Sequence, residues 1–183
     1  MYRNRKTNYQ KALLEQEKKV FSTADLAVLW EMENQNTLWT TIQRYLKREI
    51  LYPIQRGLYA TVSLRKLNSF ELGCALAGPS AYISGETILQ KNGLILQNVE
   101  KITLFGIKQK EFVVAGHKYL CRYLHRKYLL NRSGIKEKIG YSLASAERAV
   151  IDLWYINPSY YFDNLQAMNE TKLKQLKRKV GYK

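Results

Sequence analysis

Residues 37–60 change from helical to strand periodicity, and this change constrains the fold more than any other stretch of the chain. The apolar residues of one helix face recur at the spacing i, i+4, i+7 and i+8, and they are Leu38, Ile42, Tyr45 and Leu46. Two short pieces of strand composition follow, ILYPI and LYATV, with Arg56-Gly57 between them as a turn. The stretch therefore predicts an amphipathic helix that leads directly into a β-hairpin.

Two further helices are predicted before this one. The pattern from Tyr9 to Lys19 indicates a helix with Leu13 and Leu14 facing inward. Ser22 is followed three residues later by Asp25, the spacing of a capping box, which predicts the start of a second helix. Asn34 or Asn36 can cap the third helix, and Trp39, at the border of its packed face, is expected in the core. Three helices followed by a two-stranded ribbon is the order of a winged helix-turn-helix.

The outer face of the third helix and the hairpin turn together predict a DNA-binding site. Amide side chains there suit adenine, whereas arginine and lysine suit guanine or phosphate. At the turn, Gly57 tolerates positive φ and Arg56 can pair with a phosphate. The expected contact residues are Asn36, Thr40, Gln43, Arg44, Lys47, Arg48, Arg56 and Gly57. The alternative is a winged helix that contacts protein, with these side chains merely solvated.

The net charge also favours a polyanionic partner. The chain holds 30 Lys and Arg against 15 Asp and Glu, a formal charge of +15 that is spread over both halves. Such an excess favours nucleic acid over an anionic membrane surface. There is no 18-residue apolar run to span a membrane, and MYRNRKTNYQ lacks the apolar core of a secretory signal. With two cysteines and no disulfide framework, a cytoplasmic protein is expected.

We expect an α+β protein in which residues 1–66 form the winged helix-turn-helix and residues 67–183 form a mixed α/β domain. In the second part, SGETILQKNG predicts a short helix capped by Ser84. Strands are expected at KITLF, EFVVA and KYLCRYL, the last two as a hairpin around Gly116. LASAERAVIDLWYI predicts a helix with Arg148 and Asp152 as an ion pair on its outer side. A basic amphipathic helix, KLKQLKRKV, closes the chain.

Three segments carry a resemblance to a known family. VFSTADLAVLW through RGLYA, then NSFELGCALAGPSAYISGETILQKNGLI, then SLASAERAVIDLWY, are together similar to the abortive-infection antitoxin (AbiEi) family of toxin–antitoxin systems. The resemblance implies an N-terminal DNA-binding domain that represses its own operon. It also implies a C-terminal domain that neutralises a nucleotidyltransferase-like toxin without a tight complex. The third helix and Arg56 match the DNA-binding element of the family by position.

No enzyme and no cofactor are predicted. His117, Cys121 and His125 are spaced four apart, but on a strand such positions lie roughly 13 Å from one another, too far for one zinc ion. The segment HKYLCRYLHRKYLLNR interleaves tyrosines with basic residues, and core packing of the tyrosines is favoured over stacking on bases. A nucleic-acid contact through Arg122, Arg126 and Lys127 remains a hypothesis. A regulator without a toxin and an RNA-binding factor are the alternatives to an antitoxin.

Overall fold

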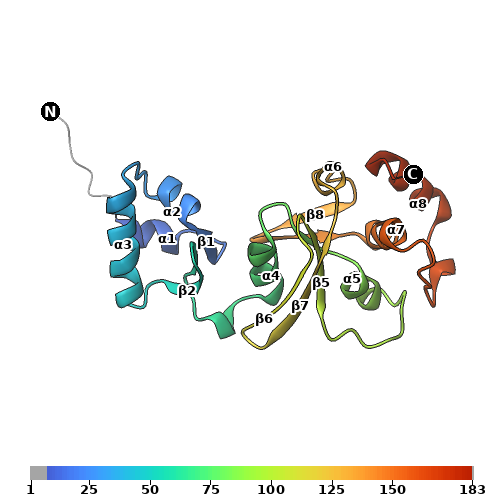
Figure 1. Ribbon diagram of the computed structural model, residues 1–183, viewed down its shortest axis with the longest axis horizontal. Helices are drawn as coiled ribbons and strands as arrows, with labels where there is room; N and C mark the ends of the chain where they lie inside the picture. Colours follow the sequence, from blue (N-terminus) through green and yellow to red (C-terminus); the bar gives the residue numbers. More distant parts are fainter. Residues whose placement is uncertain (1–7, 183) are drawn as a thin grey trace. The chain divides into compact units, whose positions relative to one another are not determined.

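The computed structural model describes residues 8–182 and has the α+β composition expected from the sequence, with two separate sheets (Figure 1). The chain divides into two compact units, unit 1 from Met1 to Asn68 and unit 2 from Ser69 to Lys183. This division falls two residues after the expected boundary. A 3-10 turn, η1 (Leu64–Lys66), lies just before it.

Unit 1 contains the elements expected around the hairpin, with one additional strand. In chain order they are α1 (Tyr9–Leu14), β1 (Val20–Ser22), α2 (Thr23–Leu29), α3 (Gln35–Lys47), β2 (Tyr52–Gln55) and β3 (Leu58–Ala60). The strands form an antiparallel sheet of order β1-β3-β2. The buried core of unit 1 contains Leu13, Phe21, Leu26, Trp30, Leu38, Ile42, Tyr45, Leu51 and Tyr59.

Local side-chain chemistry sets the ends of α2 and α3. The Ser22 backbone N–H donates to Asp25 Oδ2 over 2.7 Å, and the Asp25 N–H donates to Ser22 Oγ over 3.1 Å, so the predicted capping box is confirmed. Asn34 caps α3 by accepting from the backbone N–H of Asn36 at 2.9 Å. After the C-cap of each helix comes a glutamate in the left-handed region, Glu31 after α2 and Glu49 after α3, in the hydrogen-bond pattern of a Schellman motif.

Two expectations for unit 1 are wrong. The first helix ends at Leu14 rather than near Lys19. Leu14 is 72% exposed instead of facing inward, because it lies about 100° around the helix from the buried Leu13. Trp39 is 55% exposed instead of buried. It lies three residues after Asn36 and four before Gln43, which places it on the polar side of α3.

Unit 2 is built on a mixed six-stranded sheet of order β6-β7-β5-β4-β9-β8. The predicted strands and the hairpin around Gly116 are confirmed. The strands are β4 (Tyr82–Ile83), β5 (Ile102–Gly106), β6 (Lys110–Val114), β7 (His117–Tyr123), β8 (Ile135–Lys138) and β9 (Tyr141–Ala144). The helices are α4 (Ser69–Ala77), α5 (Glu86–Lys91), α6 (Arg126–Leu129), α7 (Ala146–Ile156) and α8 (Glu170–Val180), with a 3-10 turn η2 (Leu165–Ala167) before α8.

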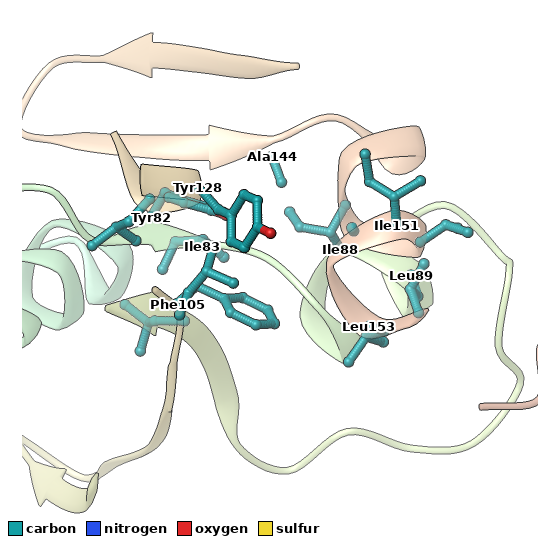
Figure 2. Close-up of a cluster of buried hydrophobic side chains, with 14 of the residues drawn as sticks. Tyr82, Ile83, Ile88, Leu89, Phe105, Tyr128, Ala144, Ile151 and Leu153 are labelled. Carbon is teal, nitrogen blue, oxygen red and sulfur yellow. The ribbon is translucent and has the colours of Figure 1, made fainter. Parts of the chain in front are cut away.

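Helices cover both faces of this sheet. On one face α4 packs so closely at Gly73 that a Cβ there would lie 2.6 Å from Cε1 of Tyr119. The other face packs against α5 and α7, whose side chains Ile88, Leu89, Ile151 and Leu153 belong to the same buried cluster as Phe105 (Figure 2). Tyr119 is 1% exposed, as the core interpretation of the tyrosines requires, whereas Tyr123 is 52% exposed.

Two expectations for unit 2 are also wrong. Ser84 does not cap α5, because the capping position is Gly85 and the Ser84 hydroxyl instead donates to Asp152 Oδ2 over 3.0 Å. Arg148 and Asp152 do form an ion pair, 2.7 Å between Nε and Oδ1, but both side chains are 0% exposed. The face of α7 that looks polar in the sequence is therefore directed into the interior of unit 2.

Candidate nucleic-acid interface

The exposed face of α3 is fixed by the packing of the opposite face. Leu38, Ile42 and Tyr45 are all buried in the core of unit 1, so the helix cannot rotate about its axis. The expected contact residues on the other side are solvent-exposed, except for Gln43, which is half-buried. The exposed members on α3 and at its C-terminal cap are Asn36, Thr40, Arg44, Lys47 and Arg48.

The cations of this surface are not neutralised by acidic neighbours. Between residues 8 and 182, no carboxylate forms an ion pair with Arg44, Lys47, Arg48 or Arg56. The Arg44 guanidinium lies 5.8 Å from the centre of the Tyr45 ring, which restrains it without removing its charge. The exposed side of α3 and the hairpin turn therefore carry four positive charges that are available to a polyanion.

The hairpin turn is held in place by α2. Gly57 has φ +77°, a backbone conformation that a residue with a Cβ rarely adopts, so the expected role of Gly57 in the turn agrees with its geometry. Its carbonyl oxygen accepts a hydrogen bond from the Thr23 backbone N–H over 3.0 Å. Arg56 is exposed beside it. The turn thus presents a guanidinium from a backbone that is anchored to the first residue of α2.

Two side chains modify the predicted site. The Thr40 hydroxyl donates to the Asn36 carbonyl over 2.8 Å, so it can only accept from a ligand while that bond persists. Trp39, which the sequence analysis assigned to the core, adds an exposed indole between Asn36 and Gln43. The spacing of Trp39 from Asn36 and Gln43 in the sequence is enough to place its side chain on the polar face of α3. The surface can therefore offer amide, cationic and aromatic groups together.

Unit 2 contains a buried polar cluster, which is a second candidate site. The guanidinium of Arg148 uses all five N–H donors: Nε to Asp152, Nη1 to the carbonyls of Asn131 and Ser133, and Nη2 to Tyr82 Oη and the carbonyl of Tyr128. The carboxylate of Asp152 accepts from Arg148 Nε and from three hydroxyls, those of Tyr82, Ser84 and Tyr182. Because every polar atom has a partner, this cluster is structural.

The protonation states of the cluster follow from its burial. Burial, the largest single effect, would lower the pKa of the Arg148 guanidinium, but the charge of Asp152, the hydroxyls of Tyr82 and Tyr182 and the hydrogen bond to Asp152 together outweigh it, so the pKa is raised. Burial, and then the nearby Asp152 charge, raise the pKa of the Tyr182 hydroxyl above its ordinary value. Tyr182 therefore stays protonated and donates to Asp152 over 2.6 Å.

The cysteines and histidines do not form a metal centre in the part of the chain that the structure describes. No three His, Cys, Asp or Glu side chains gather there. Cys74 and Cys121 are buried as free thiols, and burial raises the pKa of Cys74 to about 11. Over the same residues, no helix is long and apolar enough to cross a membrane.

Comparison with known proteins adds no relative. No protein-family model matches the chain, and no curated protein matches its sequence. The functional assignment therefore depends on the geometry of unit 1 and on the resemblance carried by the three sequence segments.

Proposed function

We propose that unit 1 is a winged helix-turn-helix that binds duplex DNA, with α3 in the major groove and the β2–β3 turn on the flanking backbone. The observation that carries the proposal is a set of four cations on the exposed side of α3 and at the turn that form no ion pair within residues 8–182: Arg44, Lys47, Arg48 and Arg56. The order of helices and strands, with β3 between β1 and β2, supports this assignment.

The side chains divide into two kinds of contact. Asn36 and Gln43 are amides that match the edge of adenine, and Arg44 or Lys47 matches guanine or a phosphate. Arg48, at the C-terminal cap of α3, and Arg56, at the turn, are placed for the sugar-phosphate backbone, which positions the protein without selecting a sequence.

We further propose that the protein is an antitoxin of the AbiEi type, which represses its own operon and counteracts a nucleotidyltransferase-like toxin. The support is the resemblance of the three sequence segments. In the structure, Arg148 and Asp152 of the segment ASAERAVIDL belong to the buried polar cluster of unit 2. A winged-helix regulator without a toxin is the alternative. Co-expression with a nucleotidyltransferase encoded beside the gene separates the two, because only an antitoxin restores growth.

The DNA-binding proposal is tested by titrating duplex containing the promoter of the protein's own gene at several salt concentrations. Arg56→Ala should weaken binding to all sequences and reduce the slope of log K against log salt by about 1. Gln43→Ala should cost about 1–3 kcal/mol at one base pair and leave the salt slope nearly unchanged.

Lys11→Ala is the matched control, since Lys11 is an exposed cation of unit 1 that is not among the proposed contact residues and pairs with Glu15, the C-cap of α1. It should bind as the wild type does. If Arg56→Ala and Gln43→Ala also bind as the wild type does, the docking geometry is wrong. If the wild-type protein ignores duplex DNA even at low salt, unit 1 serves another purpose, such as a protein contact.

A further inference from the structure

Unit 2 has its own surface of exposed basic and aromatic side chains at the ends of α6 and α8. We call it the basic–aromatic patch, and it consists of Lys127, Tyr155, Arg178 and Lys179. In Figure 1, α6 and α8 both lie along the upper side of unit 2, and α7 lies next to α8. None of these residues belongs to the DNA-binding surface proposed for unit 1.

Aromatic packing joins the three helices at this point. The rings of Tyr128 and Tyr182 lie 4.6 Å apart, which brings the end of the chain after α8 against α6. Tyr155 of α7 stacks on Tyr182 with ring centres 4.6 Å apart and planes at 17°, and it meets Tyr128 edge-on at 4.9 Å. Tyr128 and Tyr182 are buried, whereas Tyr155 is 41% exposed. One tyrosine is therefore left open to solvent on top of a packed aromatic base.

The cations of the basic–aromatic patch have no acidic partner among residues 8–182. Lys127 Nζ lies 4.6 Å from the centre of the Tyr128 ring, and the Lys179 backbone carbonyl accepts a hydrogen bond from Asn131 Nδ2 over 2.8 Å. Arg122, which the sequence analysis grouped with Arg126 and Lys127, is different, because it pairs with Glu86.

The buried polar cluster holds this surface rigid. The Tyr182 hydroxyl donates to Asp152 Oδ1 over 2.6 Å. Arg148 donates to the carbonyl of Tyr128 in α6 and to those of Asn131 and Ser133 in the segment that follows it. The ring beneath Tyr155 and the backbone beside Lys127 are thus fixed by the same buried ion pair. A preorganised surface loses little conformational freedom when a ligand binds.

We propose that the basic–aromatic patch binds single-stranded nucleic acid, with one base stacked on Tyr155 and the neighbouring phosphates on the surrounding cations. Aromatic platforms inside positively charged surfaces bind single strands in this way, because every base has a face that can stack. In a duplex the base faces are already stacked on one another, so duplex DNA does not offer this contact. The activity goes beyond the duplex binding proposed for unit 1.

The test uses the full-length protein and fluorescence anisotropy with a labelled single-stranded oligonucleotide of mixed sequence, prepared once as RNA and once as DNA. Tyr155→Ala should weaken binding by roughly tenfold, whereas Tyr155→Phe, which keeps the stacking face, should bind nearly as the wild type does. The double substitution Lys127→Glu with Lys179→Glu should abolish binding at moderate salt and provides a second test that keeps all three tyrosines, although it removes the contact of Lys127 with the Tyr128 ring. Binding of both oligonucleotides, or of RNA alone through contacts to the 2′-hydroxyl, agrees with the proposal.

Two controls separate this surface from the one on unit 1. Tyr161→Ala removes a tyrosine that is 77% exposed and lies outside the patch, and it should change nothing. Arg56→Ala should weaken duplex binding while leaving single-strand binding intact. The proposal is overturned if neither oligonucleotide binds, if Tyr155→Ala and the double substitution bind as the wild type does, or if Arg56→Ala abolishes single-strand binding. If only the duplex-binding experiment fails, the proposal for the basic–aromatic patch is unaffected.

Discussion

Replacing Tyr182 by phenylalanine should destabilise unit 2 by about 2 kcal/mol. The substitution removes only the hydroxyl that donates to Asp152 Oδ1 over 2.6 Å and leaves the ring contacts with Tyr128 and Tyr155 in place. A hydrogen bond to a charged group contributes about 1.5–3 kcal/mol to stability. The expected cost is in the middle of that range, because the same oxygen still accepts from Arg148 Nε over 2.7 Å.

The size of the thermal shift follows from the size of the unit. For about 115 residues, an unfolding entropy of about 2.1 cal/mol/K per residue gives about 0.24 kcal/mol/K, so a loss of 2 kcal/mol lowers Tm by about 8 °C. Differential scanning calorimetry measures this shift directly. Tyr161→Phe is the control, since Tyr161 is 77% exposed, and its Tm should stay within about 1 °C of the wild type.

Tyr82→Phe should cost more than Tyr182→Phe. The Tyr82 hydroxyl both donates to Asp152 Oδ2 and accepts from Arg148 Nη2, each over 2.9 Å, so two buried groups lose a partner. A Tm for Tyr182→Phe that matches the Tyr161→Phe control would refute the conclusion that the buried cluster holds the end of the chain. If Tyr82→Phe and Tyr182→Phe lower Tm by the same amount, the expectation that losing two hydrogen bonds costs more than losing one is wrong. The conclusion that the cluster stabilises unit 2 would still hold.

Three further predictions concern single positions. Ala115→Asn should raise the stability of unit 2 by about 0.5–1 kcal/mol in urea unfolding, because Ala115 has φ +52° and Asn-Gly is the preferred pair in such a two-residue hairpin turn; a loss of stability would contradict the turn geometry. Glu49→Gly should stabilise unit 1 by about 1 kcal/mol, because Glu49 follows the C-cap of α3 at φ +55°, a conformation that glycine adopts without strain. The control Glu33→Gly, at an exposed position outside α2 and α3, should not raise the free energy of unfolding. The thiol of Cys74 should resist labelling by dithionitrobenzoate at pH 8 until the protein unfolds. The pKa of the Cys74 thiol is near 9.0 in the unfolded chain and about 11 in the folded protein, so the folded state binds more protons between these pH values. The free energy of unfolding should therefore fall by up to about 3 kcal/mol as pH rises from 9 to 11. A free energy of unfolding that does not change over this range would contradict the burial of this thiol.

The sequence was sufficient to predict those features of the structure that depend on residues close together in the chain. The capping box at Ser22 and Asp25 and the turn at Gly57 each depend on residues close together in the chain. For α3 the sequence narrowed the cap to Asn34 or Asn36, and the structure shows Asn34. The strand at KYLCRYL follows from alternation along one segment. The helix-to-hairpin transition of residues 37–60 was predicted for the same reason, and with it the exposed polar face of α3.

Which polar face of a helix meets solvent and which meets the interior was decided only by tertiary structure. Arg148 and Asp152 have the spacing of an ordinary surface ion pair, and local pattern cannot reveal that Tyr82, Ser84 and Tyr182 supply hydroxyls from 30 to 70 residues away along the chain. Burial of a charge is stable only when such distant partners satisfy it. Periodicity fixes where a helix lies and which residues share a face, but the partners of that face come from the fold as a whole.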